Sequence, residues 1–358
     1  MSSVQVIIVG QGFAGTAVAW TLASRGIDFV VIDNEIPQTS SRIAAGLVTP
    51  ITGKRAVKTW EWDEAWELAR SFYPEIERRT GTNFWTIQPA LRLFDSEEER
   101  ARIENQTMIH SDLVTSYQPS CAMDQSIDQS FGGILMKVAA RLDGLAYLEA
   151  SRDAFQQRNA YHRRSIDLMN DIQVSAESIA IPALGVRARN LVICQGFSPE
   201  PNPWFSSLPL VPAQGDILTV DIPSFYEMRT IHRNVWITPV GNQTKNALKT
   251  HYLVGSTYRW RPLDGLPSLD ARQEILSKLS RWLVRPIEVI DHRAAIRPTS
   301  FDQKPLVGKS PMDPRIWVLN GLGAKGTLMA PWCAEQLVEA LLDGSEVQSS
   351  LFWDRRHQ

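Results

Sequence analysis

The first 33 residues constrain the fold more than any other part of the chain, because apolar runs and a glycine-rich turn follow one another there. Residues 4–9 read VQVIIV, which predicts a strand buried on both faces of a parallel sheet. The turn GQGFAG at 10–15 comes next and leads into a helix of small and apolar residues that ends at Gly26. A second apolar run, DFVVID, ends at Asp33. This order is typical of a βαβ unit that binds a dinucleotide.

Three glycines and one acidic residue of this unit each suit a separate task. Gly10 permits a tight turn, Gly12 lets the backbone approach a pyrophosphate, and Gly15 lets the helix pack closely on the strand. The N-terminus of the helix offers free N–H groups to the phosphates. Asp33 lies 18 residues after Gly15, where it can accept hydrogen bonds from the ribose hydroxyls. An acid there disfavours the 2′-phosphate of NADP, but the motif fits both FAD and NAD.

The segment SSRIAAGLVTP at 40–50 follows the second predicted strand. Ser40 and Ser41 can donate hydrogen bonds to phosphate oxygens, and the small residues at 44–46 allow a flat ring to lie against the backbone. The segment therefore fits a loop over a pyrophosphate and a flavin. Read by itself, it equally fits an ordinary polar loop.

Length and composition fit a globular enzyme with more than one domain. The chain has 358 residues, of which 44% are hydrophobic and 21% charged. A net charge of −2 gives no basic excess, so we expect no nucleic-acid partner. No apolar stretch approaches the roughly 20 residues of a transmembrane helix. The first apolar run lacks a basic segment before it, so we expect no signal peptide.

The three cysteines, Cys121, Cys194 and Cys333, are far apart and form no CxxC pair. A disulfide framework and a zinc site are therefore not expected, and reduced thiols in a cytoplasmic protein fit this pattern. The chain contains no HExxH or other dense metal-ligand spacing, so we expect no metal. Cys194 follows an apolar run without a nearby basic partner, which predicts a core residue and not a nucleophile.

Four separate stretches resemble the D-amino-acid oxidase superfamily of FAD-dependent oxidoreductases. That superfamily includes glycine oxidase, sarcosine oxidase and the FAD-dependent domain of the bifunctional tRNA 5-methylaminomethyl-2-thiouridine enzyme. The stretches occur along the chain in the order that the family shows. They are GQGFAG with Asp33, SSRIAAGLVTP, LVICQG at 191–196, and the C-terminal pair IRPTSFDQKPLVG (296–308) and LNGLGAKGTLMAP (319–331).

The resemblance implies an α/β fold with a Rossmann-type FAD-binding domain and a discontinuous substrate domain built on an antiparallel sheet. We assign residues 1–84, 127–205 and 292–358 to the FAD-binding domain. Residues 85–126 and 206–291 form the substrate domain, where alternating runs such as DILTVDI (216–222) predict antiparallel strands. Residues 60–81 and 268–283 predict amphipathic helices. Flavin and substrate are expected in the cleft between the domains.

The resemblance also indicates how FAD is attached and which residues bind it. No cysteine stands near 295–297, where sarcosine oxidase attaches its flavin covalently. FAD should therefore be non-covalent. Lys325, at a strand-to-helix junction, would help to stabilise negative charge on the N1–C2=O end of the flavin. The cofactor-binding residues implied are Gly10, Gly12, Phe13, Ala14, Gly15, Asp33, Asn34, Ser40, Ser41, Arg42, Ala45, Gly46, Leu47, Cys194, Gly196, Gly323, Lys325, Gly326 and Thr327.

Four residues would face the substrate and form the catalytic site by the same resemblance: Leu47, Trp236, Tyr258 and Arg297. Arg297 matches the arginine that holds the substrate carboxylate in amino-acid oxidases, a task that suits its two parallel N–H donors. Each of these aromatic residues also fits plain core packing.

Three departures from the family pattern concern specificity and electron transfer. Trp236 stands where glycine oxidase has a tyrosine, which puts a specificity for small amino acids in doubt. Ala324 replaces an arginine, so that GAKG resembles the GSRG of the tRNA-modifying branch. Leu253 falls where sarcosine oxidase has its oxygen-activating lysine.

The sequence therefore predicts an FAD-dependent enzyme that oxidises the C–N bond of an amine or amino acid. A hydride would leave the α-carbon for flavin N5, the imine would hydrolyse, and O2 or a quinone would take the electrons. One alternative is an enzyme that acts on a carboxymethylaminomethyl group of a tRNA uridine. The others are an NAD-dependent dehydrogenase and a non-catalytic flavin-binding protein. The sequence leaves the oligomeric state open.

Overall fold

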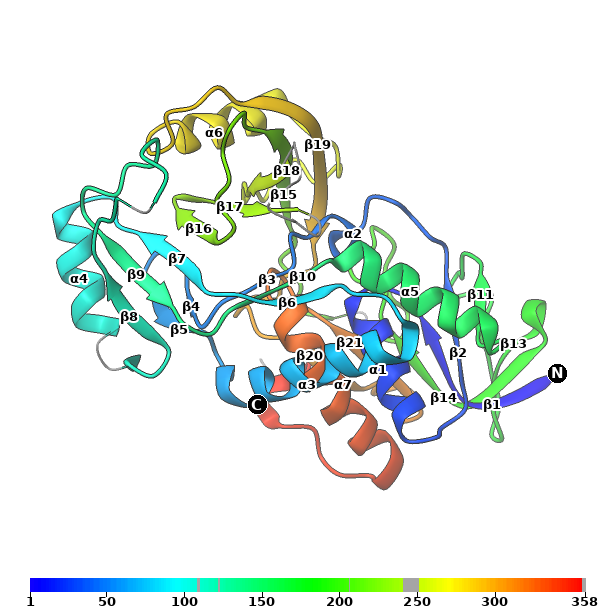
Figure 1. Ribbon diagram of the computed structural model, residues 1–358. Coiled ribbons are helices and arrows are strands. Elements are labelled where there is room, and N and C mark those ends of the chain that lie inside the picture. Colours follow the sequence, from blue (N-terminus) through cyan, green and yellow to red (C-terminus); the bar gives the residue numbers. More distant parts are fainter. Residues whose placement is uncertain (108–109, 122, 206, 241–250, 356–358) are drawn as a thin grey trace.

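The computed structural model describes residues 1–107, 110–121, 123–205, 207–240 and 251–355. Two lobes face each other across a small central sheet (Figure 1). One lobe is built on a mainly parallel sheet with helices, and the other on a mainly antiparallel sheet. This mixed architecture confirms the fold class expected from the sequence.

The first strand, β1, lies inside the first sheet, and its side chains alternate between two cores. Val6 and Ile8 face a core shared with helices, whereas Ile7 and Val9 face a second core on the opposite side. All four side chains are at most 4% exposed, which explains why the run is apolar without interruption. The strands of this sheet are β1 (Ser2–Val9), β2 (Phe29–Asp33), β11 (Tyr161–Arg163), β12 (Gln173–Val174), β13 (Ile179–Ile181), β14 (Val186–Ile193), β20 (Leu306–Lys309) and β21 (Ile316–Asn320).

The parallel part of the sheet has the order β11-β2-β1-β14-β21, and each of these strands pairs in parallel with its neighbours. The antiparallel strands β12, β13 and β20 extend it. Because parallel strands end at the same edge, the segments that follow β1, β2, β11, β14 and β21 meet there. Ligands of open α/β sheets bind at this edge.

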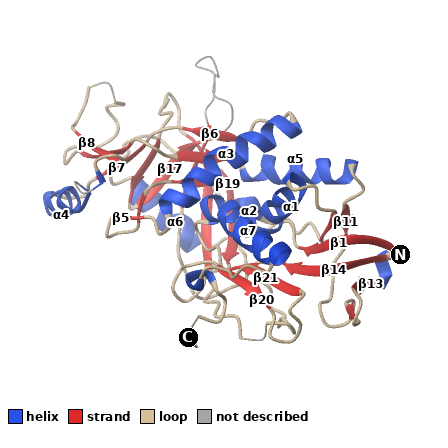
Figure 2. Ribbon diagram, turned by 90° about the horizontal axis from the view of Figure 1, so that it is seen from below, coloured by secondary structure: helices blue, strands red, loops and turns tan. Residues whose placement is uncertain are grey.

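Helices cover one face of this sheet, and loops with short strands cover the other (Figure 2). Helix α7 packs against both α1 and α3, and α5 packs against α1 and α3. The helices of this layer are α1 (Phe13–Ser24), α3 (Trp62–Thr80), α5 (Gly144–Gln157) and α7 (Gly326–Asp343).

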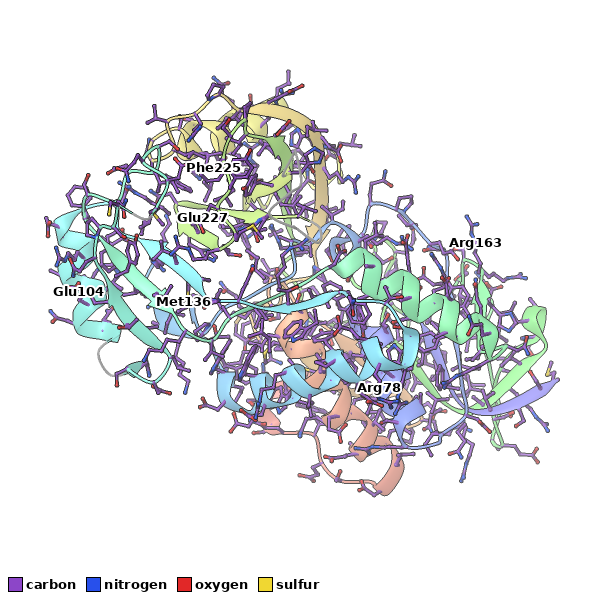
Figure 3. The ribbon with its side chains drawn as sticks, viewed as in Figure 1. Arg78, Glu104, Met136, Arg163, Phe225 and Glu227 are labelled. Atoms are coloured by element: carbon purple, nitrogen blue, oxygen red, sulfur yellow. The ribbon has the colours of Figure 1, made fainter. Side chains whose placement is uncertain are left out.

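The second lobe contains an eight-stranded sheet in which every pair is antiparallel except β16 with β7. Helix α6 (Leu269–Leu279) packs on this sheet, and α4 (Glu97–Thr107) lies beside its far end (Figure 1). Phe225 is buried inside this lobe against Tyr252 (Figure 3). The strands, in order across the sheet, are β19 (Glu288–Arg297), β15 (Ala213–Asp221), β18 (His251–Gly255), β17 (Val235–Pro239), β16 (Thr230–Arg233), β7 (Ala90–Leu93), β9 (Gly133–Met136) and β8 (Val114–Tyr117).

A three-stranded antiparallel sheet lies between the lobes, with β10 in its centre. Arg141 in β10 is directly opposite Leu47 on one side and Thr86 on the other. The neighbouring residues Val48 and Leu142 belong to the core of the helical lobe. The remaining elements are β3 (Leu47–Val48), β6 (Trp85–Ile87), β10 (Ala140–Leu142), β4 (Ile51–Thr52), β5 (Val57–Lys58), α2 (Ser40–Ile43) and the short 3₁₀ helices Pro182–Leu184 and Ser349–Leu351.

Both helices expected at 60–81 and 268–283 form, with shorter bounds, as α3 and α6. The division into two domains stays a prediction. Sheet pairing nevertheless places β9 with β7 and β8, although residues 127–205 were assigned to the FAD-binding domain. Strand β19 likewise pairs with β15 through Arg297, beyond the expected boundary at 292. Sequence periodicity shows that a strand exists but not which sheet it joins.

Tyr73 connects α3 to the first turn of α7. Its side chain is 1% exposed, and its hydroxyl donates to the carbonyl oxygen of Thr327 at 2.6 Å. In a regular helix that carbonyl would accept from the N–H of residue 331, but Pro331 has no N–H. The Tyr73 hydroxyl therefore satisfies a buried carbonyl that the helix leaves without a donor.

We predict that Tyr73→Phe lowers the free energy of unfolding by about 1–3 kcal/mol, because it leaves this buried carbonyl unsatisfied. Urea titration followed by circular dichroism measures the loss. In a Pro331→Ala background, which supplies the missing helical N–H, the same substitution should cost less. An equal loss in both backgrounds would contradict this account of the hydroxyl.

Candidate functional site

The glycine-rich turn brings the start of α1 against β14. Gly10 has a φ of 102°, and a Cβ there would lie 2.5 Å from the carbonyl oxygen of Cys194. A Cβ on Gly15 would lie 1.8 Å from the carbonyl oxygen of Gly10. Only glycine permits these approaches. No side chain caps α1 at Gly12, while the Phe13 N–H donates to Ser41 Oγ at 3.1 Å, so further amides of the first turn are available to an anion.

Asp33 ends β2 beside this turn, and two backbone groups fix its carboxylate. Oδ2 accepts from the Gln11 N–H and Oδ1 from the Glu35 N–H, each at 2.7 Å. Each oxygen keeps a lone pair for a further donor, such as a ribose hydroxyl. The geometry therefore suits the role that the sequence predicts for Asp33.

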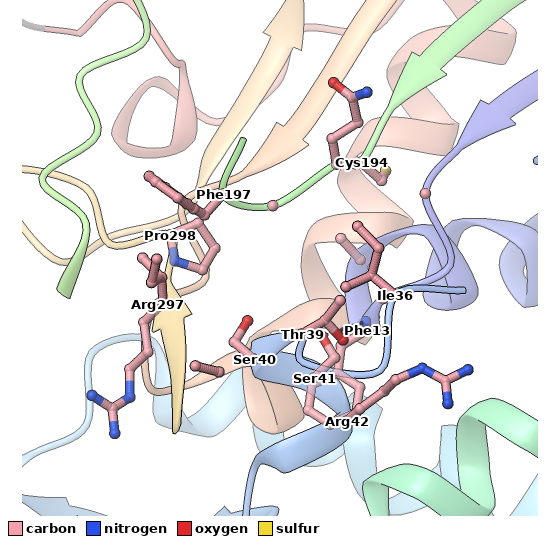
Figure 4. Close-up of a pocket in the computed structure, with 18 of the residues that line it drawn as sticks. Phe13, Ile36, Thr39, Ser40, Ser41, Arg42, Cys194, Phe197, Arg297 and Pro298 are labelled. Atoms are coloured by element: carbon pink, nitrogen blue, oxygen red, sulfur yellow. Dashed lines mark hydrogen bonds between the residues drawn. The ribbon is translucent and has the colours of Figure 1, made fainter. Parts of the chain in front are cut away.

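A cavity of about 770 Å³ opens at the edge where the parallel strands end. In Figure 4 the Ser40 hydroxyl points into its open centre, with Arg297 and Pro298 on one side and Ile36 on the other. The structure brings together at its wall most of the predicted cofactor-binding residues: Gly10, Gly12, Phe13, Ala14, Asp33, Asn34, Ser40, Ser41, Arg42, Ala45, Gly46, Leu47, Cys194, Gly196, Gly323, Gly326 and Thr327.

Two predicted cofactor residues do not line this cavity. Gly15 lies behind the turn, where it allows the close packing of α1. Lys325 is the N-cap residue of α7 and is partly buried, and this burial lowers the pKa of its ammonium group. It adjoins Gly326, which does line the cavity.

Two further segments line the cavity that the sequence did not indicate, residues 164–169 and 197–201. They follow β11 and β14, whose ends lie at the same edge as those of β1 and β2. The three-residue strand β11 is too short to recognise by periodicity. The parallel pairing of β11 with β2 is what places residues 164–169 at the cavity, and only the structure shows this pairing.

The opposite end of the cavity contains Arg297, the last residue of β19. Its Nη2 donates to Ser256 Oγ at 2.9 Å and its Nη1 to the Thr257 carbonyl oxygen at 3.3 Å. The guanidinium carbon lies 5.5 Å from the ring centroid of Tyr258. Burial lowers the pKa of the guanidinium, and among the described residues no carboxylate forms an ion pair with it. Charged N–H groups there are available to an anionic ligand.

Gly215 lies directly beneath this guanidinium. A Cβ at Gly215 would lie 2.1 Å from Arg297 Nη2 and 2.2 Å from Nη1. The absence of a side chain in β15 is therefore what allows Arg297 to lie across the strand. The sequence did not single out Gly215, because the residue it must accommodate lies 82 positions away.

Of the other three residues predicted to face the substrate, two line the cavity and one does not. Leu47 and Trp236 line the cavity, and Trp236 packs against an apolar cluster of Ile43, Ile217 and Ala295. Tyr258 does not line it. Its ring is 40% exposed, and its hydroxyl donates to Thr299 Oγ1 at 3.4 Å, so Tyr258 contacts Arg297 from outside the cavity.

A buried carboxylate supports the loop that holds Arg297. Asp216 is 1% exposed and accepts from Thr257 Oγ1 at 3.0 Å, and its Oδ2 lies 3.0 Å from His292 Nε2. The Asp216 N–H donates back to Thr257 Oγ1 at 2.9 Å. These bonds fix Thr257, whose carbonyl accepts from Arg297. The sequence did not single out Asp216, because its partners lie far away along the chain.

The buried cysteine at the cavity wall is not suited to nucleophilic chemistry. Cys194 is 4% exposed, and burial raises the pKa of its thiol, which disfavours the nucleophilic thiolate. Within the described ranges, no group of three or more histidine, cysteine, aspartate or glutamate residues could hold a metal. None of the described helices has both the length and the apolar character needed to cross a bilayer.

Comparison with known sequences gives a family for this arrangement. The sequence model of the DAO family, described as FAD dependent oxidoreductase, matches residues 5–340. The tRNA 5-methylaminomethyl-2-thiouridine biosynthesis bifunctional protein of Marinobacter nauticus is 24% identical over 94% of this chain and 55% of its own length. The chain thus spans little more than half of such relatives. Glycine oxidase of Pseudomonas putida is 23% identical over 96% of both chains.

Solved structures share the fold at low sequence identity. Glycine oxidase from Bacillus cereus superposes with a TM-score of 0.79 at 18% identity, over 96% of both chains. L-proline dehydrogenase from P. horikoshii superposes with a TM-score of 0.75 at 13% identity, over 99% of this chain and 97% of that one.

We predict that Asp33→Ala weakens FAD binding roughly ten- to a hundredfold, because it removes a charged acceptor from the cavity wall. Titration of the apoprotein with FAD, followed by quenching of flavin fluorescence, gives the dissociation constant. Asp28→Ala removes an exposed acid just before the same strand and serves as the control. Equal dissociation constants for the two variants would exclude the predicted role of Asp33.

Proposed function

Because this chain belongs to the DAO family of FAD-dependent oxidoreductases, we propose that it oxidises the C–N bond of an amine that carries a carboxylate, such as an amino acid. Arg297 carries this proposal. It is a partly buried cation at the wall of the cofactor cavity, and no described carboxylate pairs with it. A substrate carboxylate would supply the missing partner.

The cavity fits FAD on the observations that concern phosphates and close backbone approach. Gly10 and Gly15 let the start of α1 pack closely against the end of β14, and the uncapped first turn of α1 is available to a phosphate. Family membership decides between FAD and NAD in favour of FAD. Non-covalent attachment remains part of the proposal, with Asp33 holding the ribose and Ser40 and Ser41 near the phosphates. Bound FAD would supply the acceptor for the hydride.

The residues of this chain would bind and orient the substrate and exclude water. Arg297 holds the carboxylate, and its own direction is fixed by Ser256 and Thr257. Trp236 and the apolar cluster beside it shield the α-carbon from solvent. The described residues that line this end of the cavity include no acid and no histidine. The substrate would therefore enter with a neutral amine, and its proton would be lost to solvent before oxidation. O2 or a quinone is the proposed electron acceptor.

A second candidate substrate is a carboxymethylaminomethyl group on a tRNA uridine. The Marinobacter relative, which is named for tRNA modification, supports it, as does the GAKG segment. Tyr258 and Trp260 add a structural observation. Their rings meet edge to face with centroids 5.3 Å apart, and they are 40% and 59% exposed. Exposed aromatic rings beside a carboxylate-binding arginine suit a stacked nucleobase.

Anaerobic reduction of the purified holoenzyme tests both candidates. We expect the flavin absorption bands to bleach with one class among amino acids and N-methyl amino acids. Bleaching only by tRNA that carries the modified uridine would select the second candidate. If none of these compounds bleaches the flavin, the proposed oxidation is wrong, and the flavin-binding protein without catalysis becomes the better account.

We predict that Gly215→Ala raises the KM of an amino-acid substrate at least about tenfold, because the new methyl group displaces the guanidinium of Arg297. FAD content and melting temperature should stay close to wild type, since a side-chain tip can move where a backbone could not. Steady-state kinetics with Arg297→Lys as a comparison measures the effect. An unchanged KM would show that Arg297 does not hold the substrate.

A further inference from the structure

Arg141 occupies the central strand of the sheet between the lobes. Directly opposite residues of antiparallel strands project from the same face. Arg141 therefore shares a face with Leu47, its partner in β3, and Leu47 lines the cavity. The alternate residues Val48 and Leu142 are 1% and 0% exposed in the helical core, so Arg141 lies on the face turned away from that core.

The Arg141 guanidinium is partly buried without a described partner. Its Nε is buried and makes no hydrogen bond, and no described carboxylate forms an ion pair with it. Asp143 is the acid whose charge acts on it, but the Asp143 carboxylate caps α5 by accepting from the Ala146 N–H at 3.2 Å. Burial lowers the pKa of Arg141, which reflects the cost of keeping this charge out of water.

Arg233 in the second lobe is an example of a buried arginine with a structural role. Arg233 has a side chain that is only 5% exposed, and it pairs with Asp95 and Asp128 at 3.1 and 3.0 Å. A buried cation that lacks such a partner is strongly destabilising. Arg141 lacks such a pair although its burial is costly, which is the situation of a group that meets its partner in a ligand.

We propose that Arg141 binds a second carboxylate of the substrate, so that the enzyme prefers an amine or amino acid with two acidic groups. This inference rests on the proposed function, in which Arg297 takes the first carboxylate. Arg141 is not itself among the lining residues of the cavity, so a ligand would reach it past Leu47, which lines the cavity and is the partner of Arg141 in the sheet. A substrate with an apolar side chain would leave Arg141 unpaired.

Binding of glutarate and butyrate to the holoenzyme tests the proposal without turnover. The two compounds have similar carbon chains and differ by one carboxylate. Calorimetric titration should show that wild type binds glutarate more tightly than butyrate. Arg141→Met, which keeps the length of the side chain, should reduce this preference roughly ten- to a hundredfold and leave butyrate binding unchanged. Arg187→Met, at an exposed position in β14, should retain the preference.

The melting temperature supplies a second readout. Arg141→Met should melt no lower than wild type, because no described hydrogen bond or ion pair is lost. Glutarate should raise the melting temperature of wild type more than that of the variant. A wild type without preference for glutarate, or a preference that survives Arg141→Met, would overturn the proposal.

The binding test of Arg141 and the flavin-reduction test of the proposed oxidation can fail independently of each other. If no amine reduces the flavin, the oxidation fails, while the glutarate measurement still decides whether Arg141 binds a second carboxylate. If amines reduce the flavin, a dicarboxylic amino acid should do so with a higher kcat/KM than its monocarboxylic analogue. Arg141→Met should then abolish most of this difference, and Arg141→Lys should restore part of it.

Discussion

The contact of the β1–α1 turn with β14 is the constraint on which the rest of the site depends. Side chains at Gly10 or Gly15 would overlap the neighbouring backbone, so the turn closes without a gap. This closeness sets the first turn of α1 at the edge where the parallel strands end. The same edge receives Asp33 from β2 and residues 164–169 from β11. The cavity therefore results from strand order, and its chemistry from the few residues that follow each strand.

The sequence predicted those parts of the site whose signals are local. Glycine spacing, an unbroken apolar run and Asp33 lie within one short segment, and the resemblance located Arg297. The rest depends on pairing between distant segments. Strand β11 is recognised only through its parallel pairing with β2, and β9 joins the second sheet across a domain boundary drawn at 126. Asp216 in β15 contacts His292 in β19 and Thr257 just after β18, which no local pattern reveals.

Buried and partly buried arginines in this protein differ in whether a carboxylate pairs with them. Arg233 has carboxylates on both sides and contributes to the rigidity of the second lobe. Arg297, at the cavity wall, is held by a backbone carbonyl and a hydroxyl group, and Arg141, behind Leu47 in the central sheet, has no described carboxylate partner. An unpaired buried charge is costly in the free protein, and an anionic ligand would offset that cost. In the proposed function, the contrast between paired and unpaired arginines distinguishes the scaffold from the binding surface.

The bond between Tyr73 and Thr327 also has a consequence for the order in which the chain becomes folded. The two residues are 254 positions apart, and the pairs Val6–Asn190 of β1 and β14 and Leu191–Ile316 of β14 and β21 also join distant segments. During synthesis, α1 and α3 are made long before α7, against which both pack. The surfaces by which α1 and α3 contact α7 therefore stay unpacked until residues 326–343 leave the ribosome. Because Gly326 and Thr327 line the cavity, its wall is complete only after this helix has been made.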